Sequence, residues 1–205
     1  MMKGLERLLE LAGKTKWYAL AFVALLFISY TFREEIKKHV FPAISATYRV
    51  EEGITNSLNI QLSLRGLMEK YDADRAYIFL FHNGVKYYNG SHKLKISCDY
   101  EVTQAGISRE AEKLQDLPVG LFSEWINQVI QNRMFINDLE QIDELNVRVM
   151  LEEQGITGLA VVPYYADGRL IAMIGVDYVV RNYSITNKEQ FKYDSQQLGL
   201  LLDNF

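Results

Sequence analysis

The stretch TGLAVVPYYADGRLIAMIGVDYVV, residues 157–180, decides the fold of this chain. It contains two apolar runs, 157–165 and 169–180, and the short segment between them includes Asp167-Gly168. Apolar runs of this length on either side of an Asp-Gly pair are typical of a β-hairpin with a tight turn. The chain is therefore predicted to form an antiparallel sheet with this hairpin at its centre.

Two further strands are predicted upstream of this hairpin. Residues 75–82, RAYIFLFH, are apolar and aromatic, and the Asn83-Gly84 pair that follows is a strong signal for a second hairpin turn. Residues 93–102 alternate in polarity, which predicts a strand with one buried face and one wet face. The buried face is expected to carry Leu94, Ile96, Cys98, Tyr100 and Val102, and the wet face Lys93, Lys95, Ser97, Asp99 and Glu101.

Helical periodicity predicts four helices around these strands. They are expected over 43–71, from 118 onwards, over 143–154 and over 187–203, the last opened by a Thr186-x-x-Glu189 capping box. Residues 106–117 are predicted as an ordered loop or lid, and 134–139 as a short strand. The order of elements predicts an α+β domain, an antiparallel sheet with helices packed against it. The first and last helices are expected on the same side of the sheet.

An uncharged segment near the N-terminus predicts a membrane span. Residues 17–32, WYALAFVALLFISYTF, are flanked by Lys16 and Arg33 and would extend roughly 24 Å as a helix. That is somewhat shorter than a hydrocarbon core of about 30 Å, but the two flanking cations can reach the headgroups. A cleaved signal peptide and a buried helix of a soluble domain remain as alternatives.

The span divides the chain into four predicted parts. Residues 1–16 are expected to form an amphipathic tail, 17–32 the transmembrane helix, 33–53 a juxtamembrane linker or helix, and 54–205 the soluble domain. Basic residues are slightly more frequent before the span than after it, which favours a cytoplasmic N-terminus in a bacterial inner membrane and a periplasmic domain. The segment 44–57 is expected to pair with a second copy, which predicts self-association.

Charge and motifs exclude several function classes. Residues 1–50 carry a net charge of +4 and residues 51–205 a net charge of −8, so the bilayer is an expected partner and nucleic acid is not. Cys98 is the only cysteine, and its spacing from the histidines matches no metal motif. Phosphate-binding, Rossmann, serine-hydrolase and zinc-protease motifs are absent. We therefore expect no enzyme activity, metal or cofactor.

One carboxylate within an apolar run indicates a candidate ligand site. Asp177 lies in the apolar run IGVDYV, where a carboxylate needs a partner or a wet pocket unless it lies at the strand end facing water. Aromatic walls with a few polar groups are typical of small-molecule sites. Trp125 is also a candidate for plain core packing. The tentative ligand-binding set is His82, Asn83, Tyr87, Tyr88, Cys98, Tyr100, Trp125 and Asp177.

Several local sequences resemble those of GAF domains, the PAS-like sensor fold. The segment GITGLAVVPYYADGRLIAMIGVDYVV, residues 155–180, is similar to the GAF segment in which a strand ends in a proline, turns through Asp-Gly and returns as an apolar strand. Residues 74–81 and the run FINDL at 135–139 resemble their GAF counterparts, so the resemblance covers roughly 54–203. It implies a GAF-like antiparallel sheet flanked by helices. The cysteine attachment sites of GAF photoreceptors and the motifs of cyclic-nucleotide binding are not recognisable.

The layout of the whole chain resembles the holin family of T-even bacteriophages. The run PYYADGRLIAMIGVDYVVRNYSITNKE, residues 163–189, is similar in pattern to that family's C-terminal strands. This resemblance implies a phage lysis protein whose exported domain receives a regulatory signal from a partner protein. The leading hypothesis is therefore a non-enzymatic, holin-like membrane protein. The alternative is a membrane-anchored sensor whose GAF-like domain binds a small ligand in the cytoplasm and dimerises.

Overall fold

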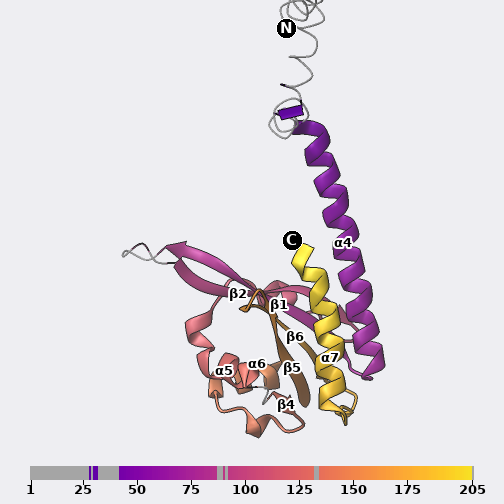
Figure 1. Ribbon diagram of the computed structural model, residues 1–205. Coiled ribbons are helices and arrows are strands. Elements are labelled where there is room, and N and C mark those ends of the chain that lie inside the picture. Colours follow the sequence, from indigo (N-terminus) through magenta and orange to yellow (C-terminus); the bar gives the residue numbers. More distant parts are fainter. Residues whose placement is uncertain are drawn as a thin grey trace, which may run out of the picture. The chain divides into compact units, whose positions relative to one another are not determined.

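The computed structural model describes residues 28, 30–31, 42–86, 90, 92–131 and 134–204. The chain divides into two compact units, Met1–Gly53 and Ile54–Phe205, and the second contains the sheet (Figure 1). The predicted tail and nearly all of the predicted span, residues 17–32, lie outside the described residues. Among the helices that are described, none is both long enough and apolar enough to cross a bilayer.

The second unit is built on one antiparallel sheet of six strands in the order β3-β2-β1-β6-β5-β4. The hairpin predicted over residues 157–180 forms β5 (Gly158–Ala166) and β6 (Arg169–Tyr178), and β6 lies in the middle of the sheet beside β1 (Arg75–Lys86). Both turn residues, Asp167 and Gly168, have positive φ, as a type I′ turn requires. The outer strands are β2 (His92–Thr103), β3 (Leu117–Pro118) and β4 (Phe135–Ile136).

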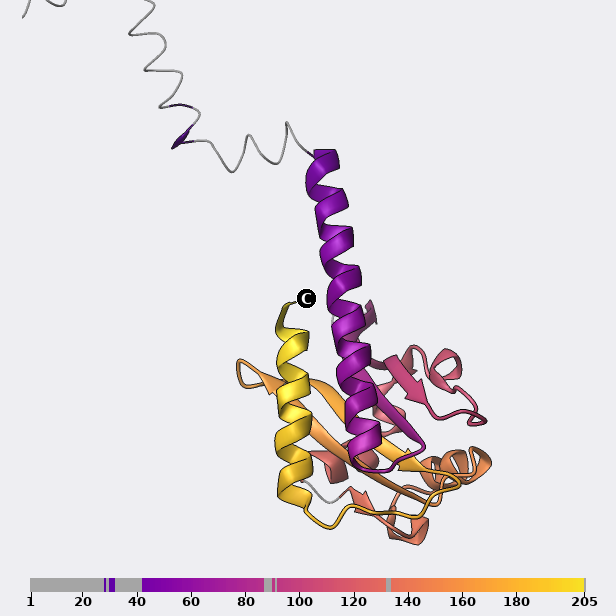
Figure 2. The ribbon, with the colours of Figure 1, turned by 90° about the vertical axis from the view of Figure 1, so that its right-hand side faces the viewer.

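Two helices cover one face of the sheet, as predicted (Figure 2). They are α4 (Pro42–Lys70) and α7 (Lys188–Gly199), the latter continued by the 3-10 turn η4 (Leu200–Asn204). From Ile60 onwards α4 buries one apolar stripe against the sheet, and Phe191 and Leu198 of α7 join the same cluster. The stripe follows the spacing of three and four residues that places side chains on one side of a helix.

The opposite face carries shorter helices and the long connection between β2 and β4. They are α5 (Ser123–Ile130) and α6 (Leu145–Glu153), with the 3-10 turns η1 (Ala111–Lys113), η2 (Val119–Leu121) and η3 (Leu139–Gln141). Trp125, Ile126 and Val129 of α5 are buried in this second core together with Val147 and Leu151 of α6. The sheet therefore separates two apolar cores.

The prediction of a hairpin turn at Asn83-Gly84 is wrong. β1 continues through both residues to Lys86, and Asn83 pairs with Leu94 of β2. Glycine is required at position 84 for a different reason. A Cβ there would lie 2.8 Å from the Lys93 carbonyl oxygen, so only glycine lets β2 approach this closely. The chain reverses between Lys86 and His92 instead.

The prediction of one buried and one wet face for β2 is also wrong. Ile78 pairs with Tyr100 and Phe79 with Cys98, so Asp99 is an extra residue that forms a β-bulge. A bulge reverses the alternation of side chains. Cys98 therefore joins the core under α5 and α6, whereas Tyr100 packs on the α4 side. Glu101, expected in water, has only 1% of its side chain exposed.

The last helix begins at a different residue from the one predicted. Asn187, not Thr186, is the N-cap of α7, and its side chain accepts a hydrogen bond from the backbone N–H of Gln190. Thr186 and Asn187 are both favourable cap residues, and the capping-box pattern selected the wrong one.

Two glycines test the packing of the helices on the sheet. A Cβ at Gly199 would overlap the ring of Tyr164, whereas a Cβ at Gly66 in α4 meets nothing within 4 Å. We expect Gly199→Ala to lower the free energy of unfolding by about 1–3 kcal/mol through overpacking. The matched variant Gly66→Ala should raise it by about 1 kcal/mol, because alanine favours the helix. Denaturant unfolding of both variants measures these changes. An equal change in the free energy of unfolding for the two variants would contradict the close contact between Gly199 and Tyr164.

Candidate functional site

The centre of the site is the guanidinium of Arg75, a cation that is buried on one face of the sheet. Arg75 opens β1 directly opposite Asp177 of β6, and only 2% of each side chain is exposed. Arg75 Nη1 lies 3.5 Å from Asp177 Oδ2. Both residues are on the face of the sheet that α5 and α6 cover. Asp177 thus has the charged partner that an apolar strand demands.

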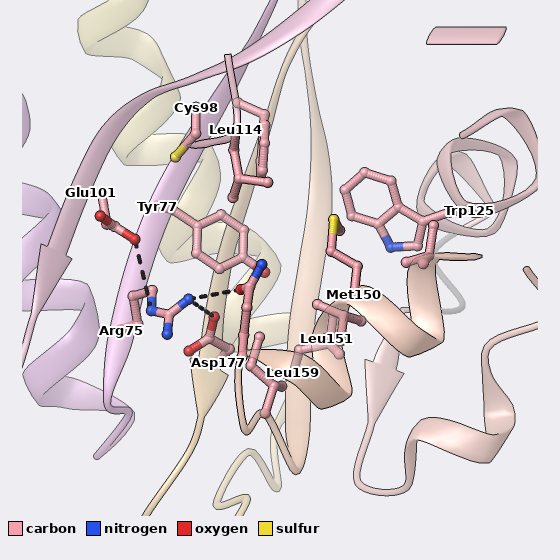
Figure 3. Close-up of a pocket in the computed structure, with 14 residues that line it drawn as sticks. Arg75, Tyr77, Cys98, Glu101, Leu114, Trp125, Met150, Leu151, Leu159 and Asp177 are labelled. Atoms are coloured by element: carbon pink, nitrogen blue, oxygen red, sulfur yellow. Dashed lines mark hydrogen bonds and ion pairs between the residues drawn. The ribbon is translucent and has the colours of Figure 1, made fainter. Parts of the chain in front are cut away.

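A second carboxylate reaches the same guanidinium from β2. Glu101 Oε1 lies 3.7 Å from Arg75 Nε, on the side away from Asp177 (Figure 3). The Glu101 carboxylate also accepts hydrogen bonds from the backbone N–H groups of Glu110, at 3.0 Å, and Ala111, at 3.2 Å. It therefore fastens the start of η1 to the sheet.

Several polar atoms of this cluster have no hydrogen-bond partner among the described residues. Arg75 Nη1 donates to Gln154 Oε1 at 3.0 Å, just after α6. Arg75 Nε and Nη2, Asp177 Oδ1 and Trp125 Nε1 are buried without a partner. Burying such groups unpaired costs about 1–3 kcal/mol each, so they require a bound water or ligand, or a functional reason.

A cavity lies between this cluster and the helices (Figure 3). Its empty space is about 430 Å³, including the part open to solvent, and about 30 Å³ of that can hold the centre of a water molecule. This is room for roughly two waters. The walls are mostly apolar. They are formed by Tyr77, Phe79, Cys98, Leu114, Trp125, Val147, Met150, Leu151, Ile156 and Leu159, and the polar floor by Arg75, Glu101, Gln154 and Asp177.

Burial sets the protonation of the groups around the cavity. Loss of hydration raises the pKa of Asp177 to about 7, and the positive charge of Arg75 opposes part of that rise. Burial also raises the pKa of the Cys98 thiol far above its usual value. Cys98 is therefore a protonated thiol at neutral pH and not a nucleophile.

Three of the residues predicted for a ligand site line the cavity: Cys98, Trp125 and Asp177. His82 and Asn83 do not line the cavity, because they lie farther along β1 than the residues that do. His82 bonds instead to Ser97 Oγ, at 2.9 Å. Tyr100 is on the opposite face of the sheet, where the bulge at Asp99 directs it. Tyr87 and Tyr88 lie outside the described residues.

Sequence reasoning missed the most polar part of the site. Arg75, Glu101 and Gln154 were not among the candidates, although all three line the cavity. A signal for Arg75 was present, since it is the only lysine or arginine in the run RAYIFLFH, which was predicted to be a buried strand. Glu101 was hidden, because only the bulge turns it inwards.

The arrangement contains no recognisable catalytic constellation. Within the described part of the chain, no group of three or more His, Cys, Asp and Glu side chains could hold a metal ion. The cluster combines one cation, two carboxylates and unpaired donors beside apolar walls. Such a site can bind and orient a small molecule through hydrogen bonds.

Comparison with known proteins identifies the fold. No family model matches the sequence, and no curated protein matches it. The structure is similar to the blue-light absorbing form of the PixJ GAF domain from Thermosynechococcus elongatus, with a TM-score of 0.58 and 15% identity over 75% of this chain and 88% of that domain. A Synechocystis GAF domain in its photoproduct state matches with a TM-score of 0.55 and 12% identity over 72% of this chain and 92% of that one.

A further similar structure is a far-red absorbing dark state with bound biliverdin IXα. It matches with a TM-score of 0.51 and 12% identity, over 69% of this chain and 85% of that one. The domain thus has the GAF fold, as its sequence indicated. At these identities the similarity establishes the fold and leaves the activity to be argued from the site.

The protonation of Asp177 gives a test of the site. Because its pKa is raised in the folded protein, its stabilising contribution is complete below about pH 4 and is lost as the pH rises through about 7. Asp177→Asn keeps the shape and removes the titration. We expect the stability of the variant relative to the parent to increase between pH 5 and pH 8 in urea unfolding. Asp167→Asn, in the exposed β5–β6 turn, should show no such change, and a pH-independent difference for Asp177→Asn would contradict the assignment.

Proposed function

We propose that this protein is a non-enzymatic sensor whose GAF-fold domain binds a small molecule in the cavity beside Arg75. The observation that carries the proposal is the set of buried, unpaired polar atoms on Arg75, Asp177 and Trp125 at an otherwise apolar cavity. A structural ion pair alone would be expected to satisfy its hydrogen bonds. A ligand that fills the cavity would pair these atoms and gain affinity by doing so.

The fold supports the sensor hypothesis better than the holin hypothesis. The similar structures are GAF domains, and one of them contains bound biliverdin. None of the similar structures named above is described as a lysis protein. The cavity in this chain is far smaller than a linear tetrapyrrole, which favours a ligand of a few heavy atoms.

We further propose that residues 17–32 anchor the domain in a bacterial inner membrane, with the domain on the periplasmic side. The uncharged run and its flanking cations support the anchor, and the distribution of basic residues supports the orientation. Self-association is part of the same proposal. Ile54, Leu58 and Leu62 of α4 are each more than half exposed, and a second copy would cover them.

Ligand binding can be tested on the full-length protein in detergent with a library of fragment-sized molecules. We expect at least one fragment to raise the unfolding temperature, and ligand-observed NMR should report its binding. Leu114→Trp and Met150→Trp, which fill the cavity from two sides, should each reduce binding at least tenfold. Val180→Trp, at a side chain that is 79% exposed, is the matched control.

The proposal fails if no fragment binds, or if both filled variants bind as well as the control. Two filling positions are needed, because Leu114 follows η1 and Met150 belongs to α6. A variant that misfolds at one position therefore leaves the other to decide.

The membrane anchor and the holin hypothesis can be tested together by expression in a bacterium. We expect the full chain to stay in the membrane fraction after a carbonate wash, with no loss of culture density. Ala24→Arg should weaken insertion by roughly 2.5–3.5 kcal/mol and release protein from that fraction. Collapse of culture density on induction would support a holin instead.

The same cells report the orientation. Cys98 is buried, so a cysteine introduced by Lys188→Cys at the exposed start of α7 should be the site that an impermeant thiol reagent labels. We expect labelling in cells whose outer membrane has been made permeable and whose inner membrane is intact. Labelling only after lysis would place the domain in the cytoplasm and overturn the orientation.

A further inference from the structure

The charges around the cavity restrict the ligand that it can take. The floor holds one cation, Arg75, between two carboxylates, Glu101 and Asp177. An anionic ligand would add a negative charge to a buried site in which Glu101 already pairs with the single guanidinium. A cationic ligand would lie against Arg75 and leave its free N–H groups unpaired. Both would be penalised where hydration is lost.

The unpaired atoms define the hydrogen bonds that a ligand must make. Arg75 Nη2 and Trp125 Nε1 are donors without a hydrogen-bond acceptor among the described residues, and Arg75 Nε has only the ion pair with Glu101, at 3.7 Å. Asp177 Oδ1 is an acceptor without a donor there. The ligand therefore needs a strong acceptor, such as a carbonyl oxygen, and at least one N–H group. The excess of donors over acceptors favours a carbonyl over an amine as the principal group.

Size and shape restrict the ligand further. The free space corresponds to roughly two water molecules. Trp125, Met150 and Leu114 form apolar walls around it (Figure 3). A compact ligand with a thin apolar body and one polar edge suits this shape, and a small ring enters it as the side chains of the apolar walls move apart.

From these features we infer that the cavity binds a small neutral molecule with a carbonyl group flanked by N–H, such as an amide, a cyclic urea or a lactam. The inference rests on the proposed function, because it names the ligand class of the same cavity. The carbonyl oxygen accepts from Arg75, the N–H donates to Asp177, and the apolar part lies against the walls.

Two ring molecules of equal size provide a matched test on the full-length protein. 2-Imidazolidinone has a carbonyl between two N–H groups, and cyclopentanone has the same ring and carbonyl without them. Acetate supplies the anion. We expect 2-imidazolidinone to bind with an affinity no tighter than roughly micromolar, which is the ceiling for so few atoms. Cyclopentanone should bind at least tenfold more weakly, and acetate should not bind measurably in ligand-observed NMR.

Variants locate the contacts. Trp125→Phe keeps the aromatic wall, so the affinity for 2-imidazolidinone should change little, because the carbonyl oxygen accepts from Arg75. Asp177→Leu removes the acceptor and should erase the preference for 2-imidazolidinone over cyclopentanone. Leu114→Trp should abolish binding of both rings. Asp72→Leu, at a side chain that is 73% exposed, is the control for Asp177→Leu and should bind like the parent.

The outcomes separate the ligand class from the function. Equal binding of the two rings, or preferred binding of acetate, would overturn the ligand class and leave a ligand-binding domain. Failure of all three probes, while another fragment binds and is lost in Leu114→Trp, would do the same. Failure of every probe and every fragment would overturn both proposals.

Discussion

The structure depends on the burial of Arg75 at the start of β1, one of the two central strands of the sheet. The guanidinium connects β1 to Asp177 of β6, to Glu101 of β2 and, through Gln154, to the end of α6. A buried cation is unfavourable unless its charge and its N–H groups are satisfied. Each neighbouring element must therefore present a polar side chain at one place. This requirement fixes the register of three adjacent strands relative to one another, more tightly than apolar packing alone would.

The residue before Arg75 has the complementary role at the end of the sheet. Asp74 Oδ2 accepts the backbone N–H groups of Val179, Val180 and Arg181, at 2.7–2.8 Å, where the chain leaves β6. These bonds lower the pKa of Asp74 although its burial acts to raise it. Asp74 thus closes the end of the central hairpin, and Arg75 next to it contributes to the floor of the cavity.

The sequence predicted the elements well and the faces of one strand poorly. Periodicity and turn residues located the central hairpin and the helices, because these depend on local spacing. The bulge at Asp99 depends on pairing between β1 and β2, and nothing local marks it. That one extra residue moved Tyr100 out of the predicted site and brought Glu101 into it. Asp177 was found because a carboxylate within an apolar strand needs a partner, whichever strand lies next to it. Its partner Arg75 was not found, because a charged residue at the end of a strand is common.

A sensor of the proposed kind must transmit occupancy of the cavity across the sheet, since α4 and α7 lie on the other face. The shortest connection is the peptide between Asp177 and Tyr178. Asp177 lines the cavity, and the Tyr178 hydroxyl donates to the Tyr71 carbonyl oxygen at 2.8 Å, just beyond α4. Alternate residues of a strand point to opposite faces, so a shift of β6 toward a ligand also shifts Tyr178. Tyr71 bonds in turn to Asp194 of α7, at 2.5 Å. The floor of the cavity is thereby joined by hydrogen bonds to the residue that follows α4 and to α7.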